Sequence, residues 1–206
     1  MLTDSTIVSE LAQYGFRSSH SQCELVRIYI SSLLKWNQKI SLTTVVDPIE
    51  ILRFHFGESL YAIQTVPIQK GRLADVGSGA GFPGLALALG VPELSTTLIE
   101  SNSKKAAFLS EIIRELRLDG AKVLRDRMES VDSGPNPFDF VTARAVGSHD
   151  ALLAWAARNL GRGGKVVLWL GEDEVTRVTT SSSIQWKEPA LIPGSKKRFI
   201  LSGSLA

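Results

Sequence analysis

The strongest constraint on the fold lies in one stretch, RLADVGSGAGFPGLALALG, at residues 72–90. It indicates a short apolar strand, a glycine-rich loop and an apolar helix closed by Gly90. Glycines allow sharp turns and let the backbone approach a ligand without an intervening Cβ. A strand that passes through such a loop directly into a helix is typical of the first unit of a doubly wound α/β sheet.

The alternation of strand and helix continues along the rest of the chain. Further strands are predicted at 95–100, 121–126, 138–143 and 165–170, with helices at 104–118 and 151–160. The tail at 184–203 predicts two more strands, antiparallel ones, and TTSSS at 179–183 predicts a loop. Continuous apolar strands between helices indicate a parallel sheet covered on both faces. We therefore predict an α/β fold with a doubly wound, mostly parallel, seven-stranded, Rossmann-like sheet.

The first 70 residues predict only helices. Apolar residues recur at helical spacing in one segment: Leu25, Ile28, Tyr29, Leu33 and Trp36. A second helix has a clear start, with Asp47 as N-cap, Pro48 in the first turn and Glu50 three residues after the cap. We therefore divide the chain into a helical N-terminal extension, 1–70, packed on a main domain, 71–206.

Composition narrows the class of protein. Hydrophobic residues make up 44% and charged residues 21% of the 206 residues, which is ordinary for a globular chain. Cys23 is the only cysteine, which excludes an intramolecular disulfide and a cysteine-built zinc cage, and we expect no metal site. The sequence MLTDSTIVSE lacks the features of a signal peptide, and no apolar run is long enough for a membrane span. We expect a cytoplasmic monomer without membrane contact.

The glycine loop fits two ligand classes. From Asp75 it contains an acidic residue followed by Gly-x-Gly-x-Gly, and from residue 79 to 84 it contains the dinucleotide pattern Gly-x-Gly-x-x-Gly. A pyrophosphate cradle needs free N–H groups in the first helical turn, and Pro83 removes one of them. Asp75 adds a negative charge that suits the amino group or sulfonium of S-adenosylmethionine (SAM). The acid favours SAM, while a dinucleotide or a purely structural turn stays open.

Polar residues follow several of the predicted strands. Glu100 follows the second strand, residues 126–129 the third and residues 143–145 the fourth. Parallel sheets bind ligands beyond the carboxyl ends of their strands, where the strand order reverses. These residues are therefore expected to converge on one site with the glycine loop. Glu100 suits the ribose hydroxyls of either cofactor.

Several segments carry a more specific resemblance. They are SLTTVVDPIEILRFHFGESL (41–60), DVGSGAGFPGL (75–85), LIESNSKKAAFL (98–109), RDRMES (125–130), FDFVTARAVGS (138–148) and VVLWLG (166–171). Together with the Leu-x-x-Gly-Gly turn at 160–164, they resemble class I SAM-dependent methyltransferases and, more narrowly, the RsmG/GidB family of small-subunit (16S) ribosomal RNA guanine-N7 methyltransferases. The resemblance implies SAM as cofactor, S-adenosylhomocysteine as product, and small-subunit ribosomal RNA or the 30S particle as partner.

The resemblance also implies roles for individual residues. The implied cofactor-binding residues are Asp75, Gly77, Gly79 and Phe82 for the methionine part, Glu100 for the ribose, and Met128 and Glu129 beside the adenine. Arg144 matches an arginine near both cofactor and substrate, and is a further implied cofactor-binding residue. A core position remains an alternative for Phe82 and Met128.

The implied reaction needs no general base. N7 of guanine carries a lone pair and no proton, so we expect catalysis by alignment, with Arg144 as the positioning residue. The resemblance makes Arg127 and Arg198 RNA-binding candidates. His55 lies in a matching segment, and a lone histidine on a helix is more often structural.

The chain departs from the family pattern at three positions. Ser41 stands where the family usually has asparagine, Glu58 where it has aspartate, and Leu170 where lysine is common. The last departure bears on the choice of substrate and not on the cofactor. Two alternatives stay open: a SAM-dependent methyltransferase with another substrate, and an NAD(P)-binding oxidoreductase. The net charge of +2 and the basic residues at 104–127 and 196–198 permit a phosphate-rich partner.

Overall fold

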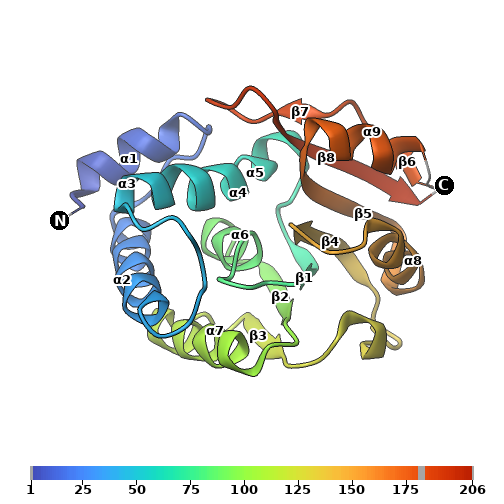
Figure 1. The fold of residues 1–206 in the computed structure, drawn as a ribbon, viewed down its shortest axis with the longest axis horizontal. Coiled ribbons are helices and arrows are strands. Elements are labelled where there is room, and N and C mark those ends of the chain that lie inside the picture. The colour runs from blue at the N-terminus through green and yellow to red at the C-terminus, as the bar shows by residue number, and fades with distance from the viewer. Residues whose placement is uncertain (1, 181–183, 206) are drawn as a thin grey trace.

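A computed structural model describes residues 2–180 and 184–205 of the chain (Figure 1). Its centre is an eight-stranded sheet in the order β3-β2-β1-β4-β5-β8-β6, with β7 paired to β8 outside this path. The strands are β1 (Gly71–Val76), β2 (Leu94–Ile99), β3 (Ala121–Leu124), β4 (Phe138–Arg144), β5 (Leu160–Gly171), β6 (Ile184–Trp186), β7 (Ala190–Leu191) and β8 (Arg198–Leu205). The first five strands pair in parallel, and β6, β7 and β8 pair antiparallel.

The predicted fold class is confirmed, with one more strand than predicted. The extra strand, β7, has two residues and pairs with Phe199 and Ile200 of β8. A strand of two residues is too short to show the alternation of apolar and polar residues by which strands are recognised in a sequence. The seven longer strands form the continuous path of the sheet.

Helices cover both faces of the sheet. The helices that follow β1, β2, β4 and β5 are α6 (Gly84–Gly90), α7 (Ser103–Leu116), α8 (His149–Asn159) and α9 (Glu172–Thr180), and a 3₁₀ turn, η2 (Met128–Ser130), follows β3. Neighbouring residues of a strand point to opposite faces. Leu98 accordingly packs with α6 and α7, whereas Ile99 packs with α8.

The structure corrects the predicted loop at 179–183. Thr179 and Thr180 belong to α9, and the remaining three residues lie outside the described part of the chain. The helix begins with three acidic residues, which the positive end of the helix dipole favours. Both threonine hydroxyls donate to carbonyls one turn earlier, so residues that resemble a loop in sequence are held in a helix.

The elements before β1 are helical within the described residues. They are α1 (Asp4–Ala12), α2 (His20–Asn37), α3 (Pro48–Ile51), the π-helix η1 (Leu52–Gly57), α4 (Glu58–Leu60) and α5 (Ala62–Thr65). The predicted start at Asp47 is confirmed, since its carboxylate accepts from the backbone N–H groups of Ile49 and Glu50. A π-helical turn after Ile51 interrupts what would otherwise be a regular helix.

The N-terminal helices share a hydrophobic core with α6 and α7. Buried residues of α1, α2 and α3 belong to the same cluster as Leu85, Phe108 and Ile112. Figure 1 shows α2 running beside α7, and Trp36 Nε1 donates to Glu111 across this contact at 2.9 Å. The division at residue 70 stays a prediction. In the described part of the chain, no helix combines the length and apolar character that a membrane crossing requires.

Candidate active site

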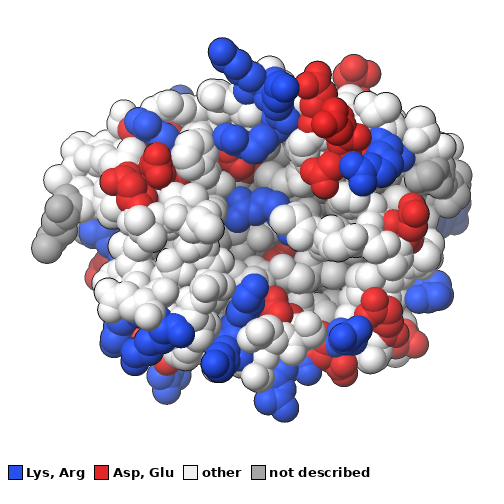
Figure 2. Space-filling model, in the orientation of Figure 1, with Lys and Arg blue, Asp and Glu red and all other residues white. Residues whose placement is uncertain are grey.

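A cavity of about 510 Å³ lies beyond the carboxyl ends of β1, β2 and β4. The chain runs outward from β1 through β2 to β3 and then returns to β4 on the other side of β1, so the strand order reverses here. Five predicted site residues line the cavity: Gly77, Glu100, Arg127, Met128 and Glu129. Ser101, Lys105, Val146 and Ser148 also line it and were not predicted. Figure 2 shows the face in view hollowed near its centre, with Lys and Arg side chains along its lower edge.

The glycines of the loop divide into two kinds. Gly77, Gly79 and Gly81 all have positive φ, at 69°, 55° and 88°. A Cβ on Gly77 or Gly79 would meet nothing closer than 3.7 Å, whereas one on Gly81 would lie 2.1 Å from Tyr29 Oη. The first two glycines therefore leave room beside the backbone, and Gly81 permits close packing against α2.

Glu100 ties this loop to the end of β2. Its Oε2 accepts from the backbone N–H of Gly79 at 2.9 Å, and its Oε1 accepts from the N–H of Asn102 at 2.7 Å. The side chain is buried yet lines the cavity. Each carboxylate oxygen can accept more than one hydrogen bond, so a ribose hydroxyl can be accommodated in addition.

Asp75 points away from the cavity. Strand alternation turns Val76 toward the cavity and Asp75 toward α6, where a Cβ on Gly84 would lie 2.7 Å from its carboxylate. The Asp75 side chain is fully buried, and its Oδ1 accepts from the Thr142 hydroxyl at 2.7 Å. Burial raises the pKa of Asp75 to about 6, against the lowering effect of the Thr142 hydrogen bond. A direct contact between Asp75 and a cofactor stays a prediction.

The pKa of Asp75 makes a testable contribution to stability. A folded-state pKa near 6 lies above the unfolded value, so the folded state binds more protons between pH 4 and 6. The free energy of unfolding should therefore fall as pH rises through this range, by about 3 kcal/mol for two pKa units. In urea unfolding, Asp75→Asn should gain about this much stability relative to wild type between pH 4 and pH 7.

The difference in unfolding free energy between Asp75→Asn and wild type is compared at several pH values. Effects of the substitution that do not depend on pH, such as changed packing, then cancel. Asp173→Asn, in the exposed first turn of α9, is the matched control for the loss of one carboxylate. A difference between Asp75→Asn and wild type that does not change with pH would contradict the prediction.

Phe82 lies in an aromatic cluster and not at the cavity. It is 4% exposed and stacks against Tyr29 at 5.1 Å and against His55 at 5.0 Å between ring centroids. The Tyr29 hydroxyl donates to the Ala80 carbonyl at 2.7 Å, and burial raises its pKa well above the usual value. Phe82 therefore occupies the core position that the sequence left open as an alternative. A contact between Phe82 and the cofactor stays a prediction.

Arg144 lies on the same side of β4 as Thr142. Its Nη1 donates to the Phe54 carbonyl at 2.9 Å and its Nη2 to His55 Nδ1 at 3.2 Å. The guanidinium lies 5.7 Å from the centre of the Phe82 ring. Burial lowers the pKa of Arg144, while Glu58 and Asp75 raise it. The next residue, Ala145, has a φ of 56° and lines the cavity, so Arg144 lies directly behind the cavity wall.

Arg127 and Arg198 have different surroundings. Arg127 is exposed, precedes η2 and lines the cavity. Arg198 is paired with the buried carboxylate of Glu58, with Nε 2.8 Å and Nη2 2.7 Å from Oε1, and lies 5.1 Å from the centre of the Phe54 ring. Glu58, one of the three departures from the family pattern, thus links α4 to β8. RNA binding by either arginine stays a prediction.

The other two departures lie apart from the cavity. Ser41 is exposed in the loop after α2. Leu170, in β5, is 4% exposed and packs in the core against the helices α8 and α9. An apolar residue is therefore consistent with its surroundings.

Three further residues support the site and were not predicted to do so. Tyr29 holds the glycine loop, and its sequence signal indicated only a core position. Thr142 binds Asp75 and has no signal of its own. Asn102 caps α7, accepting from Lys104 and Lys105 N–H groups, and its place just before a helical segment was the usable signal.

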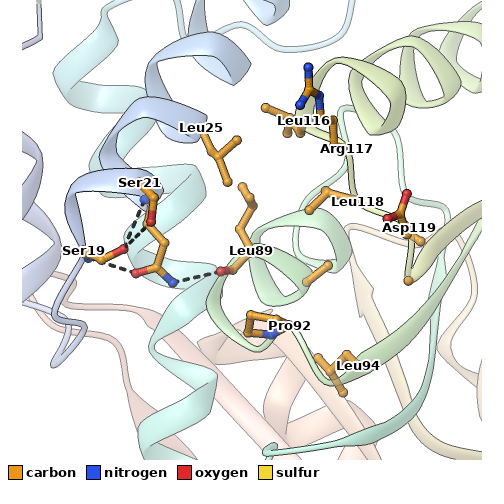
Figure 3. Close-up of a pocket in the computed structure, with 14 residues that line it drawn as sticks. Ser19, Ser21, Leu25, Leu89, Pro92, Leu94, Leu116, Arg117, Leu118 and Asp119 are labelled. Atoms are coloured by element: carbon orange, nitrogen blue, oxygen red, sulfur yellow. Dashed lines mark hydrogen bonds between the residues drawn. The ribbon is translucent and has the colours of Figure 1, made fainter.

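A second cavity, of about 520 Å³, lies between α2, α6 and α7 at the amino ends of β2 and β3. Figure 3 shows Leu25, Leu89 and Leu116 around it, with Ser19 and Ser21 at one end and Asp119 at the other. None of the predicted site residues lines it. Across residues 2–180 and 184–205, no group of three or more His, Cys, Asp or Glu side chains is placed to hold a metal ion.

Several solved structures similar to this fold are methyltransferases. A SAM-dependent methyltransferase from Aquifex aeolicus matches with a TM-score of 0.65 and 16% identity over 86% of this chain and 98% of that one. The glycopeptide N-methyltransferase MtfA, in complex with S-adenosylhomocysteine, matches with a TM-score of 0.59 and 15% identity over 73% of this chain and 90% of that one. At this identity, the likeness establishes the fold.

Sequence relatives identify the family. The protein named ribosomal RNA small subunit methyltransferase G of Xanthomonas euvesicatoria pv. vesicatoria (strain 85-10) is 37% identical over 81% of this chain and 78% of its own length. Its namesake from Chloroflexus aggregans (strain MD-66 / DSM 9485) is 30% identical over 97% of this chain and 88% of its own. The GidB family model, described as rRNA small subunit methyltransferase G, matches residues 22–198. The chain therefore belongs to the GidB family of rRNA small subunit methyltransferases.

Proposed function

We propose that the protein transfers a methyl group from SAM to N7 of a guanine in small-subunit ribosomal RNA. The observation that carries the proposal is the cavity at the strand-order reversal, which unites the glycine loop, Glu100 and η2 in a chain of the GidB family. We assign different roles to the two parts of the chain. Residues 71–206 form the cavity, and residues 1–70 support the glycine loop through the Tyr29 hydrogen bond to Ala80.

The cavity suits SAM better than a dinucleotide. Gly77 leaves room for the methionine part, Glu100 faces the ribose position, and Met128 and Glu129 border the place of the adenine. A pyrophosphate would need the free N–H groups at the start of α6. That start is capped by Pro83, and a Cβ on Gly84 would lie 2.7 Å from the Asp75 carboxylate, so a negative group already occupies this end.

The proposed cofactor supplies an electrophilic methyl group on a positively charged sulfur. The residues around the cavity bind and align the reactants, because guanine N7 has an available lone pair and no proton to remove. We propose that Arg144, held behind Ala145 by its bond to the Phe54 carbonyl, orients the acceptor base or the cofactor carboxylate. Its positive charge disfavours direct contact with N7, where positive charge develops, so we assign it to O6, a phosphate or the carboxylate.

RNA reaches the cavity past exposed basic residues. Arg127 lines the cavity, and Lys104 lies exposed in the first turn of α7 nearby. Such residues bind phosphates without reading the sequence. We propose small-subunit ribosomal RNA, alone or in the 30S particle, as the partner of a monomeric enzyme.

A second candidate function is methyl transfer from SAM to another acceptor. It rests on the sequence alone, where Leu170 replaces a lysine that is common in the family; in the structure this residue lies in the core, apart from the cavity.

Glu100→Gln should weaken SAM binding. Glutamine has one acceptor oxygen in place of two, so its amide NH₂ must face the N–H of Gly79 or Asn102. We expect the calorimetric Kd for SAM to rise at least about tenfold, the result of losing roughly 1.4 kcal/mol. The exposed Glu188→Gln is the control and should bind SAM as wild type does. Equal affinity of Glu100→Gln and wild type would contradict the predicted ribose contact.

A tritiated-methyl assay tests the proposed function. We expect label from SAM to enter intact small subunits or their naked RNA at N7 of guanine, read as 7-methylguanosine after digestion. Label that enters only small molecules or protein would support the second candidate. Calorimetric binding of NADH in place of SAM and S-adenosylhomocysteine would overturn both.

A further inference from the structure

We propose that His55 is a positioning residue that holds the Arg144 guanidinium and the loop at residues 38–47 in one fixed arrangement for methyl transfer. The inference deepens the proposed function and rests on it. It starts from the place of His55 in η1, because π-helical turns are rare and often occur at functional sites. Arg144 contacts two consecutive residues of this turn, the Phe54 carbonyl and the His55 ring.

The hydrogen bonds determine which nitrogen of His55 carries the proton. Arg144 Nη2 can only donate, so His55 Nδ1, 3.2 Å away, must accept. His55 Nε2 lies 2.8 Å from Thr43 Oγ1 and therefore donates its proton to that hydroxyl. The ring thus joins an arginine of β4 to a threonine of the loop after α2 through one defined tautomer.

Burial keeps this tautomer neutral. Desolvation and then the Arg144 charge lower the pKa of His55 to about 4. The ring is 9% exposed and stacks on Phe82 at an interplanar angle of 27°. At neutral pH, His55 therefore stays an acceptor toward Arg144, and its ring plane is held by packing.

Thr43, the partner of His55 Nε2, anchors the loop at residues 38–47. Thr43 Oγ1 also accepts from the Val45 N–H at 3.1 Å. Asn37 Oδ1 accepts from the N–H groups of Leu42 and Thr43, and Asn37 Nδ2 donates to the Thr43 carbonyl. Beyond these anchors the loop exposes an apolar side chain, Val46, which is 61% exposed. The loop and Arg144 are thus oriented together through one ring.

Holding the guanidinium has a consequence for catalysis. Two of its five N–H groups bind Phe54 and His55, which fixes the plane of the group and leaves three donors for a ligand. An arginine that is free to rotate would bind the reactants and align them less often. Loss of His55 should therefore lower kcat more than it raises KM.

Three substitutions at one position separate positioning from packing. His55→Asn places an amide oxygen near the former Nδ1 and keeps an acceptor for Arg144. His55→Gln places its amide near the former Nε2 and keeps only the contact with Thr43. His55→Phe keeps the stack on Phe82 and removes both hydrogen bonds. His20→Phe, at the exposed first residue of α2, is the control.

The measurement is single-turnover and steady-state methyl transfer, at a temperature where every variant is folded by circular dichroism. We expect His55→Phe and His55→Gln to lose about 10- to 100-fold in kcat with KM for SAM changed less than about threefold, while His55→Asn recovers at least about a third of the lost activity. Equal kcat for His55→Phe and wild type, or an Asn variant as impaired as the Phe variant, would overturn the inference.

A readout without substrate separates this inference from the proposed function. Nitrogen-15 NMR of the histidine rings in the wild-type protein should find His55 Nε2 protonated and Nδ1 unprotonated at pH 7. The Thr43→Val variant should lose that tautomer preference more than Thr43→Ser does. A protonated Nδ1 would sink the inference even if the enzyme methylates RNA, whereas the expected tautomer in a protein that does not methylate RNA would count against the proposed function alone.

Discussion

Arg144→Ala is expected to reduce methyl transfer to small-subunit RNA by about 100-fold or more, since a half-buried, oriented cation next to the proposed reaction site is worth several kcal/mol. The side chain lies behind Ala145 at the cavity wall and has two fixed hydrogen bonds. Initial rates of tritiated-methyl incorporation at saturating SAM measure the loss. SAM should still bind because Glu100 and the glycine loop are untouched, with a calorimetric Kd that rises only if Arg144 contacts the SAM carboxylate.

Stability must be followed in the same experiment. Removing Arg144 leaves the Phe54 carbonyl and His55 Nδ1 without their partner, which should cost about 1–3 kcal/mol of unfolding free energy. The protein should still fold, so activity is compared at a temperature well below the unfolding midpoint. Arg162→Ala, an exposed arginine of β5, is the control and should keep wild-type activity. Full activity of Arg144→Ala on ribosomal RNA would remove Arg144 from the mechanism.

Gly81→Ala is expected to be the most destabilising glycine-to-alanine substitution in the loop. It should lower the free energy of unfolding by about 3 kcal/mol or more. Two effects add: alanine is strained at a φ of 88°, and the new Cβ would lie 2.1 Å from Tyr29 Oη. The clash must move Tyr29 off the Ala80 carbonyl and leave a buried polar group unpaired. Thermal and urea unfolding give the loss.

Gly79→Ala separates backbone strain from the clash. This glycine also has positive φ, but a Cβ there would be 3.7 Å from its nearest neighbour, so the substitution should cost only about 1 kcal/mol. Tyr29→Phe removes the hydroxyl that meets the new Cβ, so Tyr29→Phe combined with Gly81→Ala should be less destabilised than the two single losses added together. Equal losses for Gly79→Ala and Gly81→Ala would show that contact with α2 is not what makes Gly81 necessary.

The sequence predicted the elements whose signals are local. Strand β1, the glycine loop and α6 follow from one stretch, and Asp47 marks a helix start through bonds to residues two and three positions away. The convergence of Glu100 with the glycine loop followed from strand ends alone, since parallel strands place their carboxyl ends at one edge. The π-helical turn at 52–57 and the two-residue strand β7 escaped prediction because neither has a period of its own.

By itself, the sequence determined the α/β class, the edge of the sheet at which a ligand is expected and the resemblance to the GidB family. Hydrophobic periodicity, glycine turns and helix caps each involve residues close together in the sequence, so they can be recognised from the sequence alone. Only the tertiary structure decided which way the side chains at that edge point. Asp75 faces Thr142 and α6, Arg144 reaches a histidine 89 positions earlier, and Arg198 pairs with a glutamate 140 positions earlier. Such pairings depend on which segments the fold packs together, and no local pattern records them.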